Sequence, residues 1–523
     1  MANLQSLVAL LQATQSIHAG ERVAAEQNLT VASRNPEFCV ALATLLADEN
    51  NAVPLRQLAG VMLKQFASRN WATLPGEIKK KKKEKKKNLA PFHCCKKGDP
   101  DASLVVVSES AKSQVKQLVP RALASAHSKV RTAAALSIAA IGRTDFPGKW
   151  PSLLSDLVAC LRSPNNPHLA AGALKCLDFL ATSQLADDQV PLFLQTVFPA
   201  LHAVFISAAF DESAKSRAAS VVAAVVLWIG TMMSQNPDKL TSVISQSMQM
   251  WMDGFCSVLA MRDAANSSCQ LKIKIMTILS AYAHYFPKQF RPYVGKVAEL
   301  VWANLLRDVP VFEQSVVQQD LLSGDVNDSD GNATGFELLV ASYLDFVSTL
   351  ATKKSFKELV TRSYPALVRA LFSYTQLSAA QCEQFLSDPN EFVAAEDDEL
   401  QSYSIRFVCV ELVQHLASVY RKDFLRTLLV EARELPLASS WKLRESFLYL
   451  VGSVVSDLRK HQDIFDPSAF VSSVLPDIGA ANPFLRGRAL WCASQVTKTR
   501  KKKKLFGLMD VYVQSAATFH LLL

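Results

Sequence analysis

One pattern of hydrophobic residues recurs along the chain. Apolar residues at positions i, i+4, i+8 and i+11 mark one face of a three-turn α-helix, and this spacing occurs nine times. In the first occurrence the four positions are Leu55, Ala59, Leu63 and Phe66. The nine occurrences begin at Leu55, Val130, Leu169, Ala218, Leu271, Phe336, Ile405, Leu443 and Leu485. The pattern therefore predicts nine helices that each bury one apolar face.

We call the first residue of each occurrence its anchor, and the distance between anchors predicts a repeat. From Val130 onward the anchors lie 39, 49, 53, 65, 69, 38 and 42 residues apart. These steps are close to the repeat length of HEAT helix pairs, about 40–47 residues, if the longer steps contain insertions. Between two anchor helices the other helix of each pair is expected, begun by a proline in its first turn. Examples are KWPSLLSDLVACL (Pro151), VFPALHAVF (Pro199) and SYPALVRALF (Pro365). A helix pair cannot bury its apolar face alone, so neighbouring pairs must stack. We predict an all-α, right-handed superhelical solenoid of roughly ten HEAT pairs; the alternative is an irregular all-α globule.

Composition agrees with helices. Hydrophobic residues make up 50% of the 523 residues, aromatic residues only 8%, and there are only 17 glycines, whereas strand-rich folds depend on glycine turns and on aromatic or β-branched runs. The window 218–237 carries no charge and is nearly long enough to span a bilayer. We interpret it as a buried core helix rather than as a membrane span, and no membrane insertion is expected.

The positive charge is confined to two segments. The net charge is +9, but residues 79–101 carry +7 and residues 498–504 carry +6, so the rest of the chain is mildly acidic. The step from Leu55 to Val130 is 75 residues, and removing residues 79–108 reduces it to 45. We therefore predict N-terminal repeats at 1–78, a disordered lysine-rich insertion at 79–108, a HEAT array at 109–497 and a tail without the pattern at 498–523. The lysine run could bind RNA, but it lacks the interleaved aromatic residues that stack on bases, so no direct nucleic-acid binding is expected.

No catalytic motif or metal site is visible. The chain lacks phosphate-binding, zinc-protease and nucleophile-elbow patterns, and its nine histidines are scattered singly. His93, Cys94 and Cys95 are too few and too close together to complete a four-ligand zinc site. We expect neither an enzyme nor a cofactor. Ten cysteines without CxxC spacing, and an N-terminus without a secretory leader, predict an intracellular, reducing compartment.

Charged residues stand out in two other settings. Four basic residues directly follow an anchor, and we expect them to form structural pairs between stacked helices: Arg131, Lys272, Arg406 and Arg444. The two longest steps contain polar loops at 323–335 and 387–401, and insertions of this kind project from one face of a solenoid. The second loop holds four consecutive carboxylates, which can attract a basic surface: Glu396, Asp397, Asp398 and Glu399.

Two longer strings are similar to a known family. LRQLAGVMLKQFASRNW (55–71) and SKVRTAAALSIAAIGRTDFPGKWPSLLSDL (128–157) resemble the importin-β family of nuclear transport receptors, the first string resembling its N-terminal domain. Strings at 328–340, 389–406 and 482–494 resemble one member of that family most specifically. The resemblance extends to about Val496 and covers only the N-terminal half of the family's length.

The resemblance implies binding rather than catalysis. It implies a nuclear import receptor that carries basic cargo, such as core histones or ribosomal proteins, between cytoplasm and nucleus through the nuclear pore. The partners implied are the GTPase Ran, phenylalanine-glycine nucleoporins and the cargo. Ran would contact the helix that carries Leu58, Met62, Lys64 and Gln65, and the carboxylates of Glu396–Glu399 would contact cargo or Ran. The alternative functions are a HEAT scaffold subunit without Ran dependence and an RNA binder that uses the lysine run.

Overall fold

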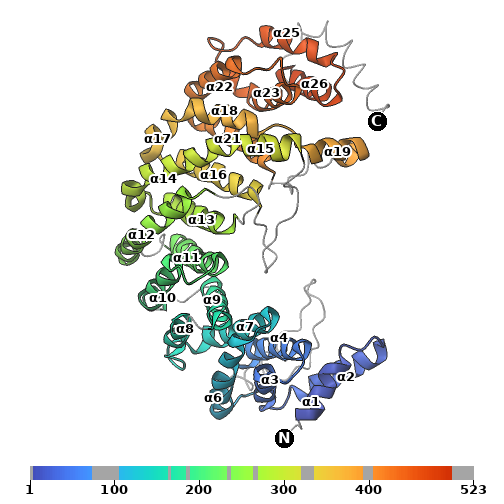
Figure 1. Cartoon of the computed structure of the whole chain (residues 1–523), viewed down its shortest axis with the longest axis vertical. Helices are drawn as coiled ribbons and strands as arrows, with labels where there is room; N and C mark the ends of the chain where they lie inside the picture. The colour runs from blue at the N-terminus through green and yellow to red at the C-terminus, as the bar shows by residue number, and fades with distance from the viewer. Residues whose placement is uncertain are drawn as a thin grey trace, which may run out of the picture. The chain divides into compact units, whose positions relative to one another are not determined.

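The structure is a computed structural model whose described residues are 4–72, 105–162, 166–183, 189–232, 237–262, 269–319, 335–392 and 404–497 (Figure 1). These residues form helices and connecting turns, and no strand occurs among them. They fall into two compact units, Met1–Ile229 and Gly230–Leu523. Each unit consists of consecutive helix pairs, which we number along the chain.

Unit 1 holds pairs 1 to 5, in which a first helix is followed by an antiparallel second helix. The second helices of pairs 2, 3 and 4 pack against one another in order, and so do the first helices of pairs 2 and 3 and of pairs 4 and 5. The pairs are α1 (Leu4–Ala13) with α2 (Ala19–Ala32), α3 (Phe38–Ala47) with α4 (Val53–Asn70), α6 (Glu109–Leu118) and η1 (Val119–Ala124) with α7 (Ser128–Asp145), α8 (Leu153–Leu161) with α9 (Pro167–Thr182), and α10 (Gln189–Ile206) with α11 (Glu212–Met232).

Unit 2 holds pairs 6 to 10, and its second helices form one continuous layer. The pairs are α12 (Pro237–Ala260) with α13 (Gln270–Tyr285), α14 (Pro287–Arg307) with α16 (Phe336–Ala351), α18 (Tyr364–Tyr374) with α21 (Ile405–Tyr420), α22 (Lys422–Glu434) with α23 (Trp441–Ser453), and α25 (Pro467–Ile478) with α26 (Pro483–Thr497). Shorter elements connect them: α15 (Val309–Phe312), the π-helical turn η2 (Glu313–Gln318), η3 (Lys354–Phe356), α17 (Lys357–Arg362), α19 (Ala379–Ser387) and α24 (Val455–Leu458).

The recurring apolar spacing marks the second helix of pairs 2 to 10. Each occurrence lies on one of these helices, except that Val454 directly follows α23. Every position of the pattern is buried except Leu169, Phe336 and Leu443, which open their occurrences. Burying one Leu, Ile or Val side chain contributes about 1.5–3 kcal/mol. Second helices such as α7, between α4 and α9, and α16, between α13 and α21, pack against second helices on both sides, so the pattern holds consecutive pairs of one unit together. The predicted all-α fold of stacked helix pairs is confirmed.

The proline prediction holds for one of its three examples. Pro365 lies in the first turn of α18. Pro151 precedes α8, which begins at Leu153, and Pro199 lies inside α10, which begins at Gln189. A proline inside a helix costs about 3 kcal/mol. The turns of α10 before Pro199 bury Val190, Phe193, Leu194 and Val197, and this burial exceeds that cost, so the helix starts earlier than predicted.

Two of the basic residues that follow an anchor cap the end of the first helix of their own pair. Arg131 donates from Nη1 to the carbonyl oxygens of Ser125 and Ala126, both at 2.8 Å. Lys272 donates from Nζ to the carbonyl oxygen of Met261 at 2.7 Å. A cation at a helix C-terminus satisfies carbonyls that have no partner within the helix, and it opposes the negative end of the helix dipole. For Arg131 and Lys272 the structural role is therefore realised inside their own pair.

Arg444 reaches a neighbouring pair. It contacts pair 10 through hydrogen bonds from Nε to Asp477 Oδ2 at 2.9 Å and from Nη2 to the Ser473 carbonyl oxygen at 2.8 Å. Arg444 thus links α23 to α25 of the next pair, in agreement with the expected pairing between stacked helices.

Within the part of the chain that the structure describes, two helices are long and apolar enough to cross a membrane by length and composition alone, α10 and α11. In the structure α11 covers most of the window 218–237 and buries Ala218, Val222, Val226 and Ile229 completely. The interpretation of this window as a core helix agrees with that packing.

The end of the predicted insertion belongs to the helical array. The backbone N–H of Val105 donates to Asn70 Oδ1 at 3.0 Å, and Val105 and Val107 are buried. Ser108 caps α6 by accepting a hydrogen bond from the N–H of Ala111. Residues 105–108, the last four of the range 79–108, therefore adjoin the helical array, with Val105 and Val107 buried in it. Residues 79–104 and 498–523 lie outside the described residues, as does most of the loop at 323–335.

Candidate functional site

The helix predicted to contact Ran borders an open groove of about 530 Å³ in unit 1. Three of the four predicted residues line this groove: Leu58, Met62 and Gln65. Leu58 and Met62 are half-buried, whereas Gln65 is exposed. Lys64 is exposed as well, but it does not line the groove. The structure therefore brings together three predicted residues and separates the fourth.

The helical period of α4 explains this arrangement. Leu58, Met62, Gln65 and Arg69 follow the spacing i, i+4, i+7 and i+11, so they form one stripe on the helix. This stripe runs beside the buried stripe that begins at Leu55 and packs into unit 1. Arg69 lines the groove too. Sequence reasoning missed Arg69, although extending the stripe by one turn would have found it.

The other wall of the groove comes from α2 and from the end of α1. Buried apolar side chains lie at its base, where the rings of Phe38 and Phe66 are 5.9 Å apart and Leu29 is 5% exposed. Polar side chains surround this base: Thr14, Gln15, Glu26, Thr30, Ser33, Gln65, Arg69 and Asn70. An apolar centre with a polar rim is the usual composition of a protein–protein interface.

A second open groove, of about 780 Å³, lies between α8 and α10. Its lining is mostly small and apolar: Val158, Ala159, Leu161, Pro199, Ala200, Ala203, Val204 and Phe210, with Arg162 and Gln195 among its polar residues. No sequence pattern indicated this groove, because both helices show only their buried faces as a pattern. Its two walls are first helices of neighbouring pairs, on the layer opposite α9.

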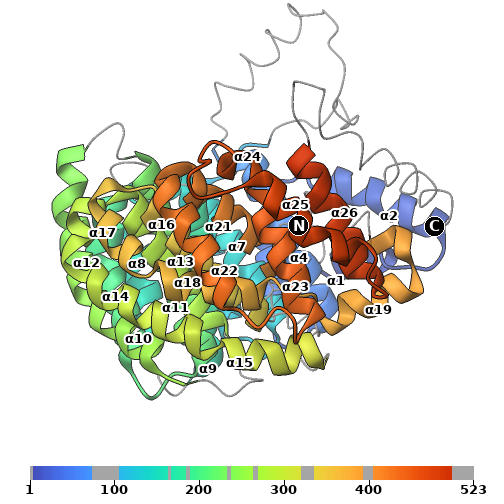
Figure 2. The same cartoon turned by 90° about the horizontal axis from the view of Figure 1, so that it is seen from above.

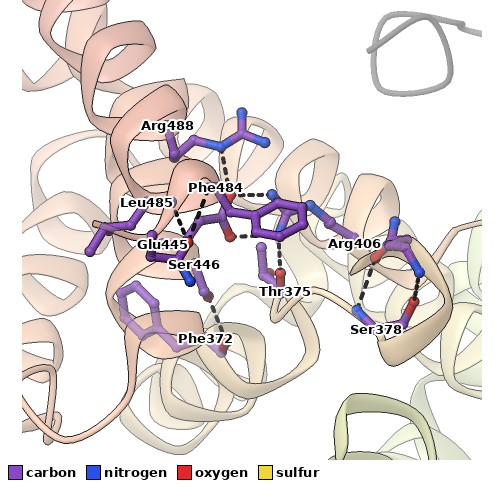
Figure 3. Close-up of polar contacts among 11 residues, drawn as sticks. Phe372, Thr375, Ser378, Arg406, Glu445, Ser446, Phe484, Leu485 and Arg488 are labelled. Atoms are coloured by element: carbon purple, nitrogen blue, oxygen red, sulfur yellow. Dashed lines mark hydrogen bonds and ion pairs between the residues drawn. The ribbon is translucent and has the colours of Figure 1, made fainter. Parts of the chain in front are cut away.

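Unit 2 contains a buried charge cluster, shown in Figure 3. Glu445 on α23 binds Arg406 on α21, with Nη1–Oε2 2.9 Å, and Arg488 on α26, with Nε–Oε1 2.7 Å. The side chains of Arg406, Glu445 and Arg488 are 4%, 2% and 13% exposed. The guanidinium groups of Arg406 and Arg488 also lie 4.4 and 3.8 Å from the centre of the Tyr449 ring.

The pKa of Glu445 reflects two opposing effects. Burial by itself raises the pKa of the Glu445 carboxyl, but the charges and hydrogen bonds of Arg406 and Arg488 outweigh burial and hold that pKa below its ordinary value. The carboxylate therefore stays ionised and joins three consecutive second helices. The structural pairing expected of Arg406 is present, whereas Glu445 and Arg488 were not identified from the sequence.

The predicted acidic run, Glu396 to Glu399, lies outside the described residues. Of the loop 387–401, the structure describes residues 387–392.

Two family models match the chain. The model described as Importin-beta N-terminal domain matches residues 25–85, which include α4 and the groove residues on it. The model described as Importin-9 central HEAT repeats matches residues 360–518. The string at 55–71 lies in the first region, and those at 389–406 and 482–494 lie in the second. The family resemblance predicted from these strings is confirmed, and importin-9 is the member that they resemble specifically.

Curated relatives include both importins and exportins. Importin-9 of Drosophila melanogaster is 24% identical over 513 residues, covering 95% of this chain and 47% of the relative. Exportin-2 of Homo sapiens is 22% identical over 534 residues, covering 92% of this chain and 48% of the relative. The chain thus spans about half the length of the curated relatives it matches.

Solved structures share the fold. A complex named Kap95:Nup1 matches 94% of this chain and 51% of its own, with a TM-score of 0.65 at 16% identity. Kap121p bound to RanGTP matches 94% of this chain and 40% of its own, with a TM-score of 0.62 at 13% identity. The predicted fold class, a HEAT-repeat solenoid, is confirmed by these matches.

Proposed function

We propose that this chain, which belongs to the importin-β family, is part of a nuclear import receptor that binds Ran, basic cargo and phenylalanine-glycine nucleoporins. The observation that carries the proposal is the groove on α4, which lies within the residues that match the Importin-beta N-terminal domain. The receptor would work in cytoplasm, nucleus and nuclear pore. Its function is binding, and we assign it no reaction.

Ran would dock on the groove that Leu58, Met62 and Gln65 line. The apolar base can take up an apolar side chain of the partner, while Arg69 and Glu26 at the rim offer charges of both signs. Lys64 would contact Ran only at the edge of the interface, because it lies outside the groove. The solved complex of a fold neighbour with RanGTP supports this partner.

Met62→Glu is expected to weaken binding of GTP-loaded Ran at least about tenfold, because a charged side chain would occupy the apolar part of the groove. Binding is measured by titration against immobilised Ran, and circular dichroism confirms the helical fold. The matched control is Val31→Glu on α2, since Val31 is 61% exposed and does not line the groove. Equal affinity of the two variants would place Ran elsewhere on the chain.

The same titration with GDP-loaded Ran separates the receptor from a scaffold. A receptor would retain Ran according to its nucleotide, whereas a HEAT scaffold without Ran dependence would retain neither form.

The match to exportin-2 favours a second candidate, an export receptor. The sign of the coupling between Ran and cargo separates the two candidates, and the coupling is reciprocal by thermodynamic necessity. Competition between GTP-loaded Ran and a basic cargo would support import, and cooperative binding would support export.

The four carboxylates Glu396–Glu399 are our proposed contact for the basic partner, because their charges can attract a cationic surface.

The groove between α8 and α10 is our proposed contact for phenylalanine-glycine repeats, since its small apolar lining leaves room for aromatic rings. The fold neighbour in complex with Nup1 supports this class of partner. Ala203→Glu is expected to reduce retention on beads coated with such repeats about fivefold, because multivalent binding amplifies the loss of one contact. The control is Leu192→Glu, since Leu192 is 39% exposed on α10 and lies outside the groove. Unchanged retention of Ala203→Glu would exclude this groove.

A further inference from the structure

Two connectors in unit 2 make contacts that skip a helix pair. In stacked repeats each pair touches only its neighbours, and the charge cluster around Glu445 follows this rule. The connector η2 belongs to pair 7, between α14 and α16, and the connector α19 belongs to pair 8, between α18 and α21. Both reach further along the chain than one pair.

The first skipping contact joins pair 7 to pair 9. Lys442, the second residue of α23, donates from Nζ to the carbonyl oxygen of Val317 in η2 at 2.6 Å. On the other side of η2, Gln376 at the end of α18 donates from Nε2 to Glu313 Oε1 at 3.1 Å. The turn η2 is thus held by pair 8 and pair 9 at once.

The second skipping contact joins pair 8 to pair 10. The ring of Phe385 on α19 lies 4.5 Å from the ring of Phe484 on α26, and Phe392 follows at 5.8 Å. Phe484 in turn stacks on Trp441 of α23, with ring centres 5.4 Å apart and an angle of 17°. In both views α19 lies next to α26 (Figure 1, Figure 2).

The two connectors also support each other. The helix α19 packs against η2, and its first turn is fixed by a capping box in which Ser378 and Gln381 exchange hydrogen bonds. Leu386, on the same short helix, is 76% exposed. The side of α19 that carries Phe385 therefore faces α26, and the side that carries Leu386 faces solvent.

We propose that η2 and α19 act as a strap that holds pairs 7 to 10 together as one stiff block. Small rotations between neighbouring pairs give a stacked-repeat protein its flexibility. A rotation between pairs 8, 9 and 10 would have to break the aromatic contact at Phe484 or the hydrogen bond at Val317. Bending within unit 2 is therefore confined to the junction between pair 6 and pair 7.

The double variant Phe385→Ala, Phe392→Ala tests the strap because it removes the aromatic side chains on and after α19 and leaves the residues of α23 and α26 unchanged. Hydrogen exchange of the full chain is measured by mass spectrometry. We expect exchange to rise about threefold or more in α23 and α26 as well as in α19, because loss of the aromatic contacts favours local opening. The control is Leu386→Ala, which should change exchange in α19 alone or not at all. The helices α12 and α13 should be unaffected in both variants.

A second variant, Lys442→Met, breaks the other link while keeping a long apolar side chain. It is expected to raise exchange in η2 and in the first turn of α23 while α19 stays protected. Faster exchange in α19 alone for the double variant, with α23 and α26 unchanged, would show that α19 only rests on the surface and would overturn the strap. The same conclusion would follow if Lys442→Met changed no element outside its own turn.

Discussion

Glu445→Ala is expected to lower the free energy of unfolding of unit 2 by about 3–5 kcal/mol, the usual cost of removing one partner from a buried ion pair. The reason is that Arg406, 4% exposed, would keep its charge without the carboxylate that now binds it. The loss would also separate α21, α23 and α26, which Glu445 joins. Chemical denaturation followed by tryptophan fluorescence measures the shift, because Trp441 and Trp491 lie on two of these helices.

The control for this variant is Glu358→Ala. Glu358 pairs with Arg362 in an exposed i,i+4 contact, with side chains 78% and 77% exposed. Such pairs contribute little, so the denaturation midpoint should barely move. A similar shift for both variants would contradict the structural role of Glu445.

The same cluster predicts the pH dependence of unit 2. The pKa of Glu445 is lower in the folded chain than its ordinary value of 4.5, so the unfolded chain binds the proton more readily. The stabilisation is therefore fully present above about pH 4.5 and is lost as pH falls below it. Glu445→Ala should remove this part of the acid sensitivity.

Gly172→Val is expected to destabilise unit 1 by about 3 kcal/mol, the upper part of the usual range for overpacking a core. A Cβ atom at position 172 would lie 2.5 Å from the carbonyl oxygen of Leu123 and 3.0 Å from its Cβ. Because the nearest atom belongs to the backbone, it cannot move aside as a side chain would. The helices α9 and η1 would have to separate, and thermal unfolding measures the loss.

The matched control is Gly487→Ala, which is expected to raise stability where Gly172→Val lowers it. Gly487 lies inside α26, and a Cβ atom there would have no neighbour within 4 Å. Alanine is favoured over glycine in a helix by about 1 kcal/mol, so this variant should be slightly more stable. Destabilisation by Gly487→Ala would mean that glycine is required there for a reason other than space.

The sequence predicted the second helices well because these helices stack on one another within each unit, as α16 does between α13 and α21. That constraint repeats in every pair and leaves a periodic signal, as at Ile405, Cys409, Val413 and Leu416. The sequence predicted the first helices of the pairs less well. In α10 a proline rule that depends on local backbone chemistry was overridden by the burial of Phe193 and Leu194 against other helices.

Of the residues that line the candidate groove, the sequence predicted only some of those on α4. Leu58, Met62 and Gln65 share a stripe of α4, so the family resemblance and the helical period place them together. The opposite wall comes from α2, and nothing in the sequence relates Glu26 to Arg69. The second groove escaped prediction for the same reason, since its walls α8 and α10 are separated by a whole helix.

The repeating unit of this protein follows from its amino-acid pattern alone, because a helix that packs into a stack needs apolar residues at a fixed spacing whatever its neighbours are. The residues that meet across pairs are set by the packing of the folded chain: Glu445 between two arginines, Leu123 against Gly172, and Phe385 against Phe484. Such contacts depend on the rotation and distance between helices, which many side chains fix jointly and no local pattern records.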